Sequence, residues 1–270
     1  MNDTKRLLFD RAALDAHRHR AEDQGLFLHD LAIDLVQERL EEVNRPFTKT
    51  GIIGWQAQRW ATGLGLDAHL MTAQDILPIT EGDDYDLLIH AMEMHWAEDP
   101  VGQLIQMRRA LKPDGLMITA MFGGRSLQKL RTALAEAEIA QKGGLSPRMS
   151  PLADIRDLGD LVQRAGYGLP VADNHLQDIQ YSTPLKLMHD LRAMGETNAL
   201  RDRPKTLTSR AILMDAMARL AADGPLTECF ELVFLTGWAP SDTQQKPLKP
   251  GSATHSLADF LGKTPKGDPN

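Results

Sequence analysis

The feature that most constrains the fold is a strand–helix–strand pattern between residues 86 and 121. Residues 86–89 consist of Asp86 followed by three apolar residues and are typical of a buried strand. Residues 101–111 carry an apolar stripe at helical spacing, and residues 116–121 form a second apolar strand. Between them, residues 112–115 (Lys-Pro-Asp-Gly) predict a tight turn, because Pro fixes φ and Gly accepts a positive φ. This crossover predicts two parallel strands whose carboxyl ends frame one crevice.

The rest of the chain alternates helical and strand-like segments around this unit. Ser126, Ser150 and Thr183 are residues that commonly precede the first turn of a helix, so each is expected to cap one. The predicted helices cover residues 4–43, 55–62, 127–141, 151–165, 184–194 and 208–222. The further predicted strands cover residues 50–54, 68–71, 169–173, 176–181 and 230–238.

Composition excludes several classes of protein. A length of 270 residues suits one large α/β domain, with or without an insert. The net charge of -7 argues against nucleic-acid binding, which needs a basic surface. No apolar run is long enough to span a bilayer. Acidic residues interrupt the basic N-terminus and argue against a targeting peptide, and the single Cys229 suits a reducing compartment, so we expect a cytoplasmic protein.

The central block from Tyr85 to Leu116, including His95-Trp96, resembles the second half of a class I S-adenosylmethionine-dependent methyltransferase sheet. Further stretches resemble the methyltransferase-like assembly factors of respiratory complex I in alphaproteobacteria and mitochondria. Their order and spacing over nearly the whole chain carry this resemblance, because each motif is short. These stretches are Phe9-Asp10-Arg11 with Arg18 and Arg20, Gly123-Gly124 with Leu127 and Leu130-Arg131, Ser146-Pro147-Arg148, Tyr181-Ser182, Met194-Gly195-Glu196-Thr197-Asn198 and Gln244-Gln245-Lys246-Pro247.

The resemblance implies a Rossmann-like α/β fold, with a mostly parallel sheet, a closing antiparallel strand at residues 230–238 and a helical insert at about 184–224. It divides the chain into an N-terminal helical segment (1–46), a methyltransferase-like domain (47–240) and a C-terminal tail (241–270). A type 11 methyltransferase is the subclass expected. The malonyl-acyl-carrier-protein methyltransferase of biotin synthesis is a more distant relative through the same central block.

S-adenosylmethionine is the cofactor that the resemblance implies. Class I enzymes hold it at a glycine-rich turn after the first strand, where small residues let the backbone approach the ligand. Here only Gly54 fits that pattern, and the segment from Gly54 to Pro78 is short by about one βα unit of roughly 30 residues. The residues expected around the cofactor are Gly54, Trp55, Asp75, Ala91 and His95.

Four residues are candidates for the substrate side: Trp96, Gly123, Arg125 and Glu196. We favour a structural interpretation for each of them. Trp96 would pack with His95, Gly123 and Arg125 would form a strand-to-helix corner, and Glu196 would lie in a loop between two helices. His90, Glu93 and His95 contain the residue types of a facial iron site, but their spacing matches no known motif, so no metal is expected. No residue stands out as a general base, and the catalytic residues stay unassigned.

The function expected is therefore that of an S-adenosylmethionine-dependent methyltransferase-like protein with weak or no activity. The acceptor would be a small molecule or a protein, including a subunit of complex I. The alternative is a complex I assembly factor that acts as a protein-arginine hydroxylase, as the mitochondrial members of the resembled family are described, or that binds its partner without catalysis.

Overall fold

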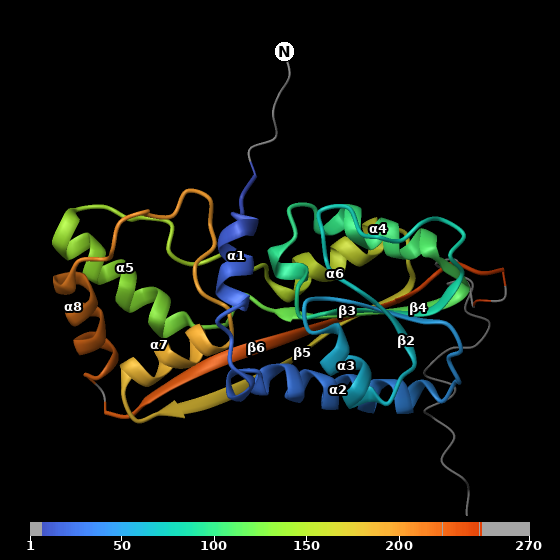
Figure 1. Ribbon diagram of the computed structural model, residues 1–270, viewed down its shortest axis with the longest axis horizontal. Coiled ribbons are helices and arrows are strands. Elements are labelled where there is room, and N and C mark those ends of the chain that lie inside the picture. Colours follow the sequence, from blue (N-terminus) through green and yellow to red (C-terminus); the bar gives the residue numbers. More distant parts are fainter. Residues whose placement is uncertain (1–6, 223, 243, 245–270) are drawn as a thin grey trace, which may run out of the picture. The chain divides into compact units, whose positions relative to one another are not determined.

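A six-stranded sheet forms the centre of the computed structural model, which describes residues 7–222, 224–242 and 244 (Figure 1). Its order is β2-β1-β3-β4-β6-β5 within this described part of the chain. The strands are β1 (Thr50–Ile53), β2 (Ala68–Met71), β3 (Tyr85–Ala91), β4 (Leu111–Phe122), β5 (Gly168–Tyr181) and β6 (Leu226–Trp238). The chain divides into two units, residues 1–240 and 241–270, and the sheet lies in the first. The predicted C-terminal tail falls mostly outside the described residues.

The predicted crossover between β3 and β4 is confirmed. Leu87 pairs with Leu116 and Ala91 with Ala120 in parallel register, and α4 (Pro100–Ala110) connects the two strands. β1 is parallel to both β2 and β3, whereas β6 runs antiparallel between β4 and β5. The sheet is therefore mostly parallel with a closing antiparallel strand, as expected. Residues 72–84 join β2 to β3 without an intervening strand, which confirms the missing βα unit.

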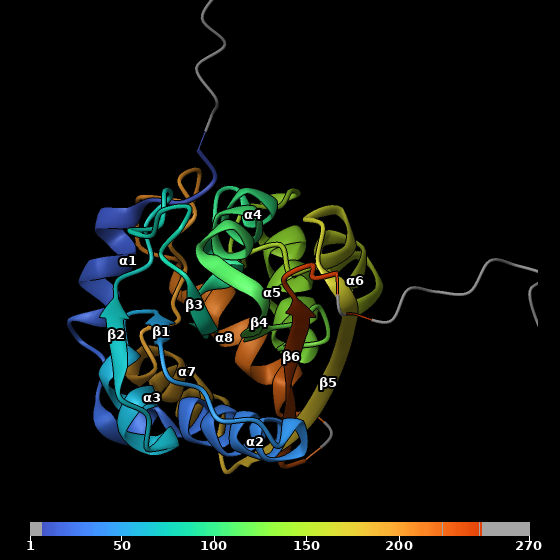
Figure 2. The same ribbon diagram turned by 90° about the vertical axis from the view of Figure 1, so that its right-hand side faces the viewer.

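Helices cover both faces of the sheet (Figure 2). One apolar cluster packs one face of the sheet against α2, α3, α5, α7 and α8. The other joins the opposite face to α4 and α6. Apart from α4, the helices of the described chain are α1 (Arg11–Arg18), α2 (Phe27–Val43), α3 (Ala57–Leu64), α5 (Gln128–Lys142), α6 (Ile155–Arg164), α7 (Pro184–Ala193) and α8 (Arg210–Leu220). Among the described residues, no helix is both long and apolar enough to cross a membrane.

The continuous helix predicted over residues 4–43 is wrong. The described part forms two helices, α1 and α2, separated by a short 3₁₀ turn at Asp23–Gly25. The turn exists because the chain here packs against the end of α7: Glu22 N donates to Ala193 O at 2.8 Å. A Cβ on Gly25 would lie 2.4 Å from the Ala193 carbonyl carbon, so only glycine allows this approach.

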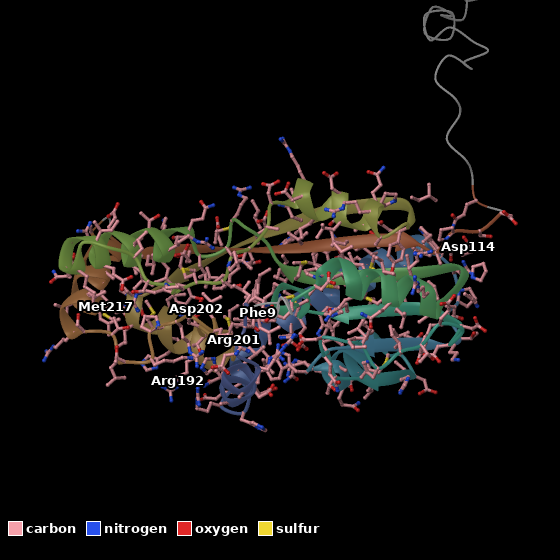
Figure 3. The ribbon with its side chains drawn as sticks, turned by 90° about the horizontal axis from the view of Figure 1, so that it is seen from above. Phe9, Asp114, Arg192, Arg201, Asp202 and Met217 are labelled. Carbon is pink, nitrogen blue, oxygen red and sulfur yellow. The ribbon has the colours of Figure 1, made fainter. Side chains whose placement is uncertain are left out.

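The turn predicted at residues 112–115 is instead a bulge near the start of β4, where the register against β3 shifts. The positive φ belongs to Asp114 (63°) and not to Gly115. Arg45 donates to the backbone and side-chain oxygens of Asp114 at 2.8 and 3.0 Å, which holds this conformation, and Asp tolerates it better than most residues. Figure 3 shows Asp114 at the end of the sheet remote from Met217 of α8.

Two of the three predicted helix caps are wrong. α5 begins after Leu127, and Glu228 on β6 accepts from Leu130 N at 2.9 Å, while the Ser126 hydroxyl bonds to the Glu231 backbone. α6 begins later than predicted, and the Asp154 side chain accepts from Arg156 N. Thr183 caps α7 as predicted. The two strands expected before α7 are one strand, β5, because β6 is long enough to pair along its whole length.

Candidate functional site

The first candidate site lies where β1 and β3 end side by side. Gly54 follows β1, and its N–H donates to Met71 O at the end of β2 at 2.9 Å. A Cβ on Gly54 would lie 2.7 Å from the carbonyl oxygen of Ala91, the last residue of β3. The structure therefore brings Gly54 and Ala91 together, as the sequence predicted. Glycine is therefore needed at position 54 because the end of β3 lies against it, whether or not a ligand binds here.

Glu93 occupies the centre of this edge. Its side chain is only 2% exposed. One oxygen accepts from the Trp55 backbone N–H at 2.8 Å, and the other lies 2.5 Å from Arg18 Nη1. Arg11 Nη1 is 3.9 Å from the same carboxylate. The N-terminal helix α1 thus supplies the counter-charges for an acid buried at the strand tips.

The residues around Gly54 do not reproduce the cofactor turn of class I enzymes. The Trp55 N–H, which would otherwise face a ligand, is already bonded to Glu93. Asp75, the candidate for the ribose hydroxyls, is exposed and pairs with Arg11 at 3.0 Å. Two of the groups expected around S-adenosylmethionine, the Trp55 N–H and the Asp75 carboxylate, therefore already have protein partners.

A cavity of about 310 Å³ adjoins this edge. Three buried nitrogen atoms on two of its lining side chains have no hydrogen-bond partner among the described residues: Nε and Nη2 of Arg18, and Nε1 of Trp55. The Arg18 guanidinium lies 5.3 Å from the centre of the Trp55 ring. The lining residues are Asp15, Arg18, His19, Trp55, Thr72, Ala73 and Glu93. We call this space the strand-tip cavity.

A second, mostly apolar cavity of about 220 Å³ lies between β4, β6, α5 and α7. Its apolar lining consists of Trp96, Phe122, Leu127, Leu130, Leu134, Met149, Leu152, Met188, Leu191, Met194 and Phe230. Its polar lining consists of His95, Ser126, Arg148, Ser150, Glu196, Thr197 and Asn198. We call it the apolar cavity.

Glu196 is the most unusual group in the apolar cavity. Its side chain is 10% exposed, and Oε2 accepts from Trp96 Nε1 at 2.8 Å and lies 3.2 Å from His95 Nε2. Burial alone would raise the pKa of Glu196, but His95, Arg18 and Trp96 together hold this pKa below its ordinary value. Oε1 is buried and has no partner within the described chain. The Glu196 carboxylate therefore borders the apolar cavity, with its charged form favoured by its neighbours and with Oε1 unpaired among the described residues.

The segments that bring Glu196 to His95 and Trp96 are far apart in sequence. Phe9 packs edge-on against Trp96, with ring centres 5.1 Å apart, and forms an isolated β-bridge with Leu200. Figure 3 shows Phe9 beside Arg201, whose Nη2 donates to the Phe9 carbonyl at 3.4 Å. The loop after α7 is thereby fixed against the N-terminal segment. This arrangement places the predicted residues His95, Trp96 and Glu196 in one cluster.

Gly123 and Arg125 do not join that cluster. Gly123 is buried against β6, where a Cβ would lie 2.4 Å from Glu231 Oε2. The Arg125 backbone N–H donates to the same carboxylate at 2.8 Å, and its side chain is exposed. Neither residue lines the apolar cavity. Their role in this structure is to form the corner between β4 and α5.

The three residues considered as iron ligands contact different partners. His90 Nε2 lies 3.2 Å from Gln103 Oε1, and burial lowers the pKa of His90 to about 3. Glu93 pairs with Arg18, and His95 contacts Glu196. Within the described residues, no three His, Cys, Asp or Glu side chains are grouped so as to hold a metal ion.

Curated relatives share long stretches with this chain. It is 37% identical over 201 residues to "Arginine-hydroxylase NDUFAF5, mitochondrial" of Danio rerio, which covers 72% of this chain and 62% of that protein. The Homo sapiens protein of that name is 35% identical over 199 residues, 72% of this chain and 57% of its own length. A malonyl-[acyl-carrier protein] O-methyltransferase of Halorhodospira halophila is 33% identical over 169 residues, 61% of this chain and 55% of that protein.

The chain is thus similar to the NDUFAF5 proteins and to the malonyl-[acyl-carrier protein] O-methyltransferase over 61–72% of its own length. It spans between 55% and 62% of the length of these curated relatives. No family model matches the chain, so the type 11 subclass stays a prediction. Among solved structures, the YcgJ protein of Bacillus subtilis is similar at 11% identity and a TM-score of 0.49, over 77% of this chain and 98% of that one. The NDUFAF5 relatives are named as mitochondrial, and a cytoplasmic location also stays a prediction.

Proposed function

We propose that this methyltransferase-like protein binds an arginine side chain of a partner protein in the apolar cavity, beside Glu196. The observation that carries the proposal is the buried carboxylate of Glu196, which is ionised and has one unpaired oxygen. A buried charge that is only partly satisfied favours a ligand with the opposite charge and with hydrogen-bond donors. A guanidinium group offers both.

The walls of the apolar cavity suit the rest of an arginine side chain. Its three methylene groups can pack against leucine and methionine side chains while its charged end reaches Glu196. Trp96 and Phe122 offer aromatic surfaces that attract a guanidinium cation. Residues 184–224 serve in this proposal as the insert that completes the cavity, because Leu191 and Met194 line it just before Glu196.

The names of the relatives support arginine as the side chain that binds. The NDUFAF5 proteins are named arginine hydroxylases, and they match 72% of this chain. The assembly-factor resemblance favours a subunit of respiratory complex I as the partner. In this proposal the chain positions the arginine, either as a non-catalytic assembly factor or for modification of its side chain.

The test is a calorimetric titration with a short peptide that contains one arginine, compared with the same peptide containing citrulline, which is uncharged and similar in shape. We expect the arginine peptide to bind at least tenfold more tightly, and Glu196→Gln to remove that preference. Glu136→Gln is a matched control, since Glu136 is an exposed partner of Arg219 outside the apolar cavity. Equal binding of both peptides to the unaltered protein would rule out this function.

S-adenosylmethionine-dependent transfer is the second candidate function. The observation that favours it is the strand-tip cavity, which lies at the edge where parallel α/β sheets bind ligands. Trp55 lines this cavity beside Gly54, and Ala91 contacts Gly54. A ligand that prefers the native state raises the melting temperature. An increase with S-adenosylmethionine would support this function, whereas an unchanged melting temperature at millimolar ligand would count against it.

A further inference from the structure

A third cavity adjoins the apolar cavity and contains the unused edge of an arginine. Its volume is about 390 Å³, and Arg131 of α5 lines it together with side chains of the N-terminal segment, of residues 147–151 and of the loop after α7. Nε and Nη2 of Arg131 are buried and have no hydrogen-bond partner among the described residues. These two nitrogens form the edge of a guanidinium that binds a carboxylate through two parallel hydrogen bonds. We call this space the Arg131 cavity.

Hydrogen bonds fix the walls of the Arg131 cavity. Leu8 N donates to Glu98 Oε2 at 2.8 Å, and Leu8 O accepts from Arg201 N at 2.8 Å. On the opposite wall, Pro147 O accepts from Asn198 Nδ2 at 2.9 Å. Leu8 and Pro147 both line the cavity. The cavity is therefore preformed, and a ligand does not have to order these segments when it binds.

The charges of the lining favour a single carboxylate over other anions. Within the described chain, Arg131 is the one cation that lines the cavity, and the exposed Asp202 lines it as well. A doubly charged phosphate would meet one cation and one acid, whereas a carboxylate carries one charge and matches the two unpaired nitrogens of Arg131. The rest of the described lining is leucine, proline and methionine, which suits the methylene groups of an acidic side chain.

The Arg131 cavity and the apolar cavity use alternate residues of one segment. Pro147 and Pro151 line the Arg131 cavity, Arg148 and Ser150 line the apolar cavity, and Met149 lines both. The two cavities are thus separated by about the thickness of one chain segment. Layers of extended chain pack about 10 Å apart, a distance that about three to four extended residues span. One bound peptide segment can therefore place a side chain in each cavity.

We infer that the Arg131 cavity binds an aspartate or glutamate side chain of the partner, a few residues from the arginine that enters the apolar cavity. This inference rests on the proposed function, because it assigns both side chains to one segment of the partner. Glu196 binds the cation and Arg131 binds the anion. The pair of sites selects an arginine with an acidic neighbour and rejects the many surface arginines that lack one.

Calorimetry with four sets of short peptides tests the inference in the full chain. Each peptide carries arginine or citrulline, and glutamate or glutamine two to five residues away on either side. We expect at least one glutamate position to bind about tenfold more tightly than its glutamine counterpart, because it gains a charge-assisted pair with two hydrogen bonds. Arg131→Gln should abolish this preference, and Arg131→Lys, which keeps the charge but loses the forked edge, should reduce it. Lys129→Gln is the matched control, because Lys129 is an exposed cation of the same helix and lines neither cavity.

The outcomes separate this inference from the proposed function. A glutamate preference without an arginine preference would contradict arginine binding in the apolar cavity but support a carboxylate site at Arg131. An arginine preference without a glutamate preference at any position would overturn the inference alone, as would a glutamate preference that persists in Arg131→Gln or disappears in Lys129→Gln. Free succinate that binds as tightly as the glutamate peptide would identify a small-molecule ligand and also overturn it. Circular dichroism checks that each variant is folded, and Arg131→Lys keeps the test valid if Arg131→Gln is not.

Discussion

Gly54 illustrates how single residues decide the geometry of the strand tips. A methyl group there would enter the space of the Ala91 carbonyl oxygen at 2.7 Å, which is backbone and cannot rotate away. Only the absence of a side chain lets β1 and β3 end this close together. The same closeness brings Trp55 within reach of Glu93, two residues after β3.

Replacing Gly54 by alanine should therefore destabilise the protein by about 2 kcal/mol, because an extra methyl group in a packed site forces backbone shifts. The measurement is the urea dependence of unfolding. Gly144→Ala is the control, since a Cβ at Gly144 meets nothing within 4 Å and Gly144 has no positive φ. Equal stability of the two variants would show that the strand tips can separate without cost.

Two buried histidines make stability depend on pH. Burial lowers the pKa of His29 from 6.5 to about 4, and His29 Nδ1 accepts from Trp60 Nε1 at 3.0 Å, which requires the unprotonated nitrogen. Burial likewise lowers the pKa of His90 to about 3. Because both folded-state values lie below the unfolded value, the unfolded chain takes up more protons in acid. Stability is complete above about pH 6.5 and falls as the pH drops toward 4.

At pH 5 the His29 contribution should amount to a loss of about 2 kcal/mol relative to pH 7. His29→Gln keeps an acceptor for Trp60 but does not titrate in this range, so we expect a smaller loss of stability between pH 7 and pH 5. His189→Gln should behave like the unaltered protein, because His189 is exposed. The measurement is the urea midpoint at both pH values. An identical pH dependence in His29→Gln would contradict the assigned cause.

At the residue scale, sequence patterns predict which side chains reach a site directly after a strand. They do not predict side chains that reach the site from segments distant in sequence. His95 and Trp96 could be placed because they follow β3, and Glu196 because it belongs to a short motif. Arg18 was expected on the helix predicted over residues 4–43 and in a stretch that resembles the assembly factors, but no role at a site was assigned to it. Its position beside Glu93 is a tertiary contact between residues 75 positions apart, which the helical pattern does not reveal. Gly123 and Arg125 were candidates for the substrate side, yet a carboxylate of β6 occupies their corner.

Tertiary contacts, and not a local side-chain cap, hold the start of α5. Buried carboxylates on β6 hold the corner before α5: Glu228 accepts from Leu130 N, and Glu231 accepts from Arg125 N. Such partners lie about a hundred residues away in sequence, so a local capping rule cannot find them. The rule instead selected Ser126 and Ser150. Thr183 was predicted correctly because its cap involves only its own helix.

The start of α6 tests which of two local side chains is the cap, Asp154 or the predicted Ser150. Asp154→Ala should lower stability by about 1 kcal/mol, because the side chain that accepts from Arg156 N is lost. For a protein of this size the melting temperature should fall by about 2–4 °C. Ser150→Ala should leave the melting temperature unchanged, since Ser150 is not the cap of α6. A larger effect of Ser150→Ala than of Asp154→Ala would restore the original prediction.

Over the whole molecule, the pattern at residues 86–121 was enough to predict the parallel half of the sheet, and the short segment after Gly54 was enough to predict the missing βα unit. The strand-tip cavity and the apolar cavity could not be predicted, because α1 lines the first and the loop after α7 lines the second, and both segments reach the sheet by tertiary contacts. Arg18 links them: it pairs with Glu93 at the strand tips and lowers the pKa of Glu196 in the apolar cavity. The N-terminal segment therefore lines the strand-tip cavity and also affects the charge of Glu196, although none of its residues lines the apolar cavity.

The central claim is that Glu196 receives an arginine side chain in the apolar cavity. A crystal structure of the protein with an arginine-containing peptide tests it most directly. We expect the guanidinium group within hydrogen-bond distance of Glu196 Oε1, with the methylene groups against the apolar wall. A peptide bound elsewhere, or an arginine that points away from Glu196 into solvent, would contradict it.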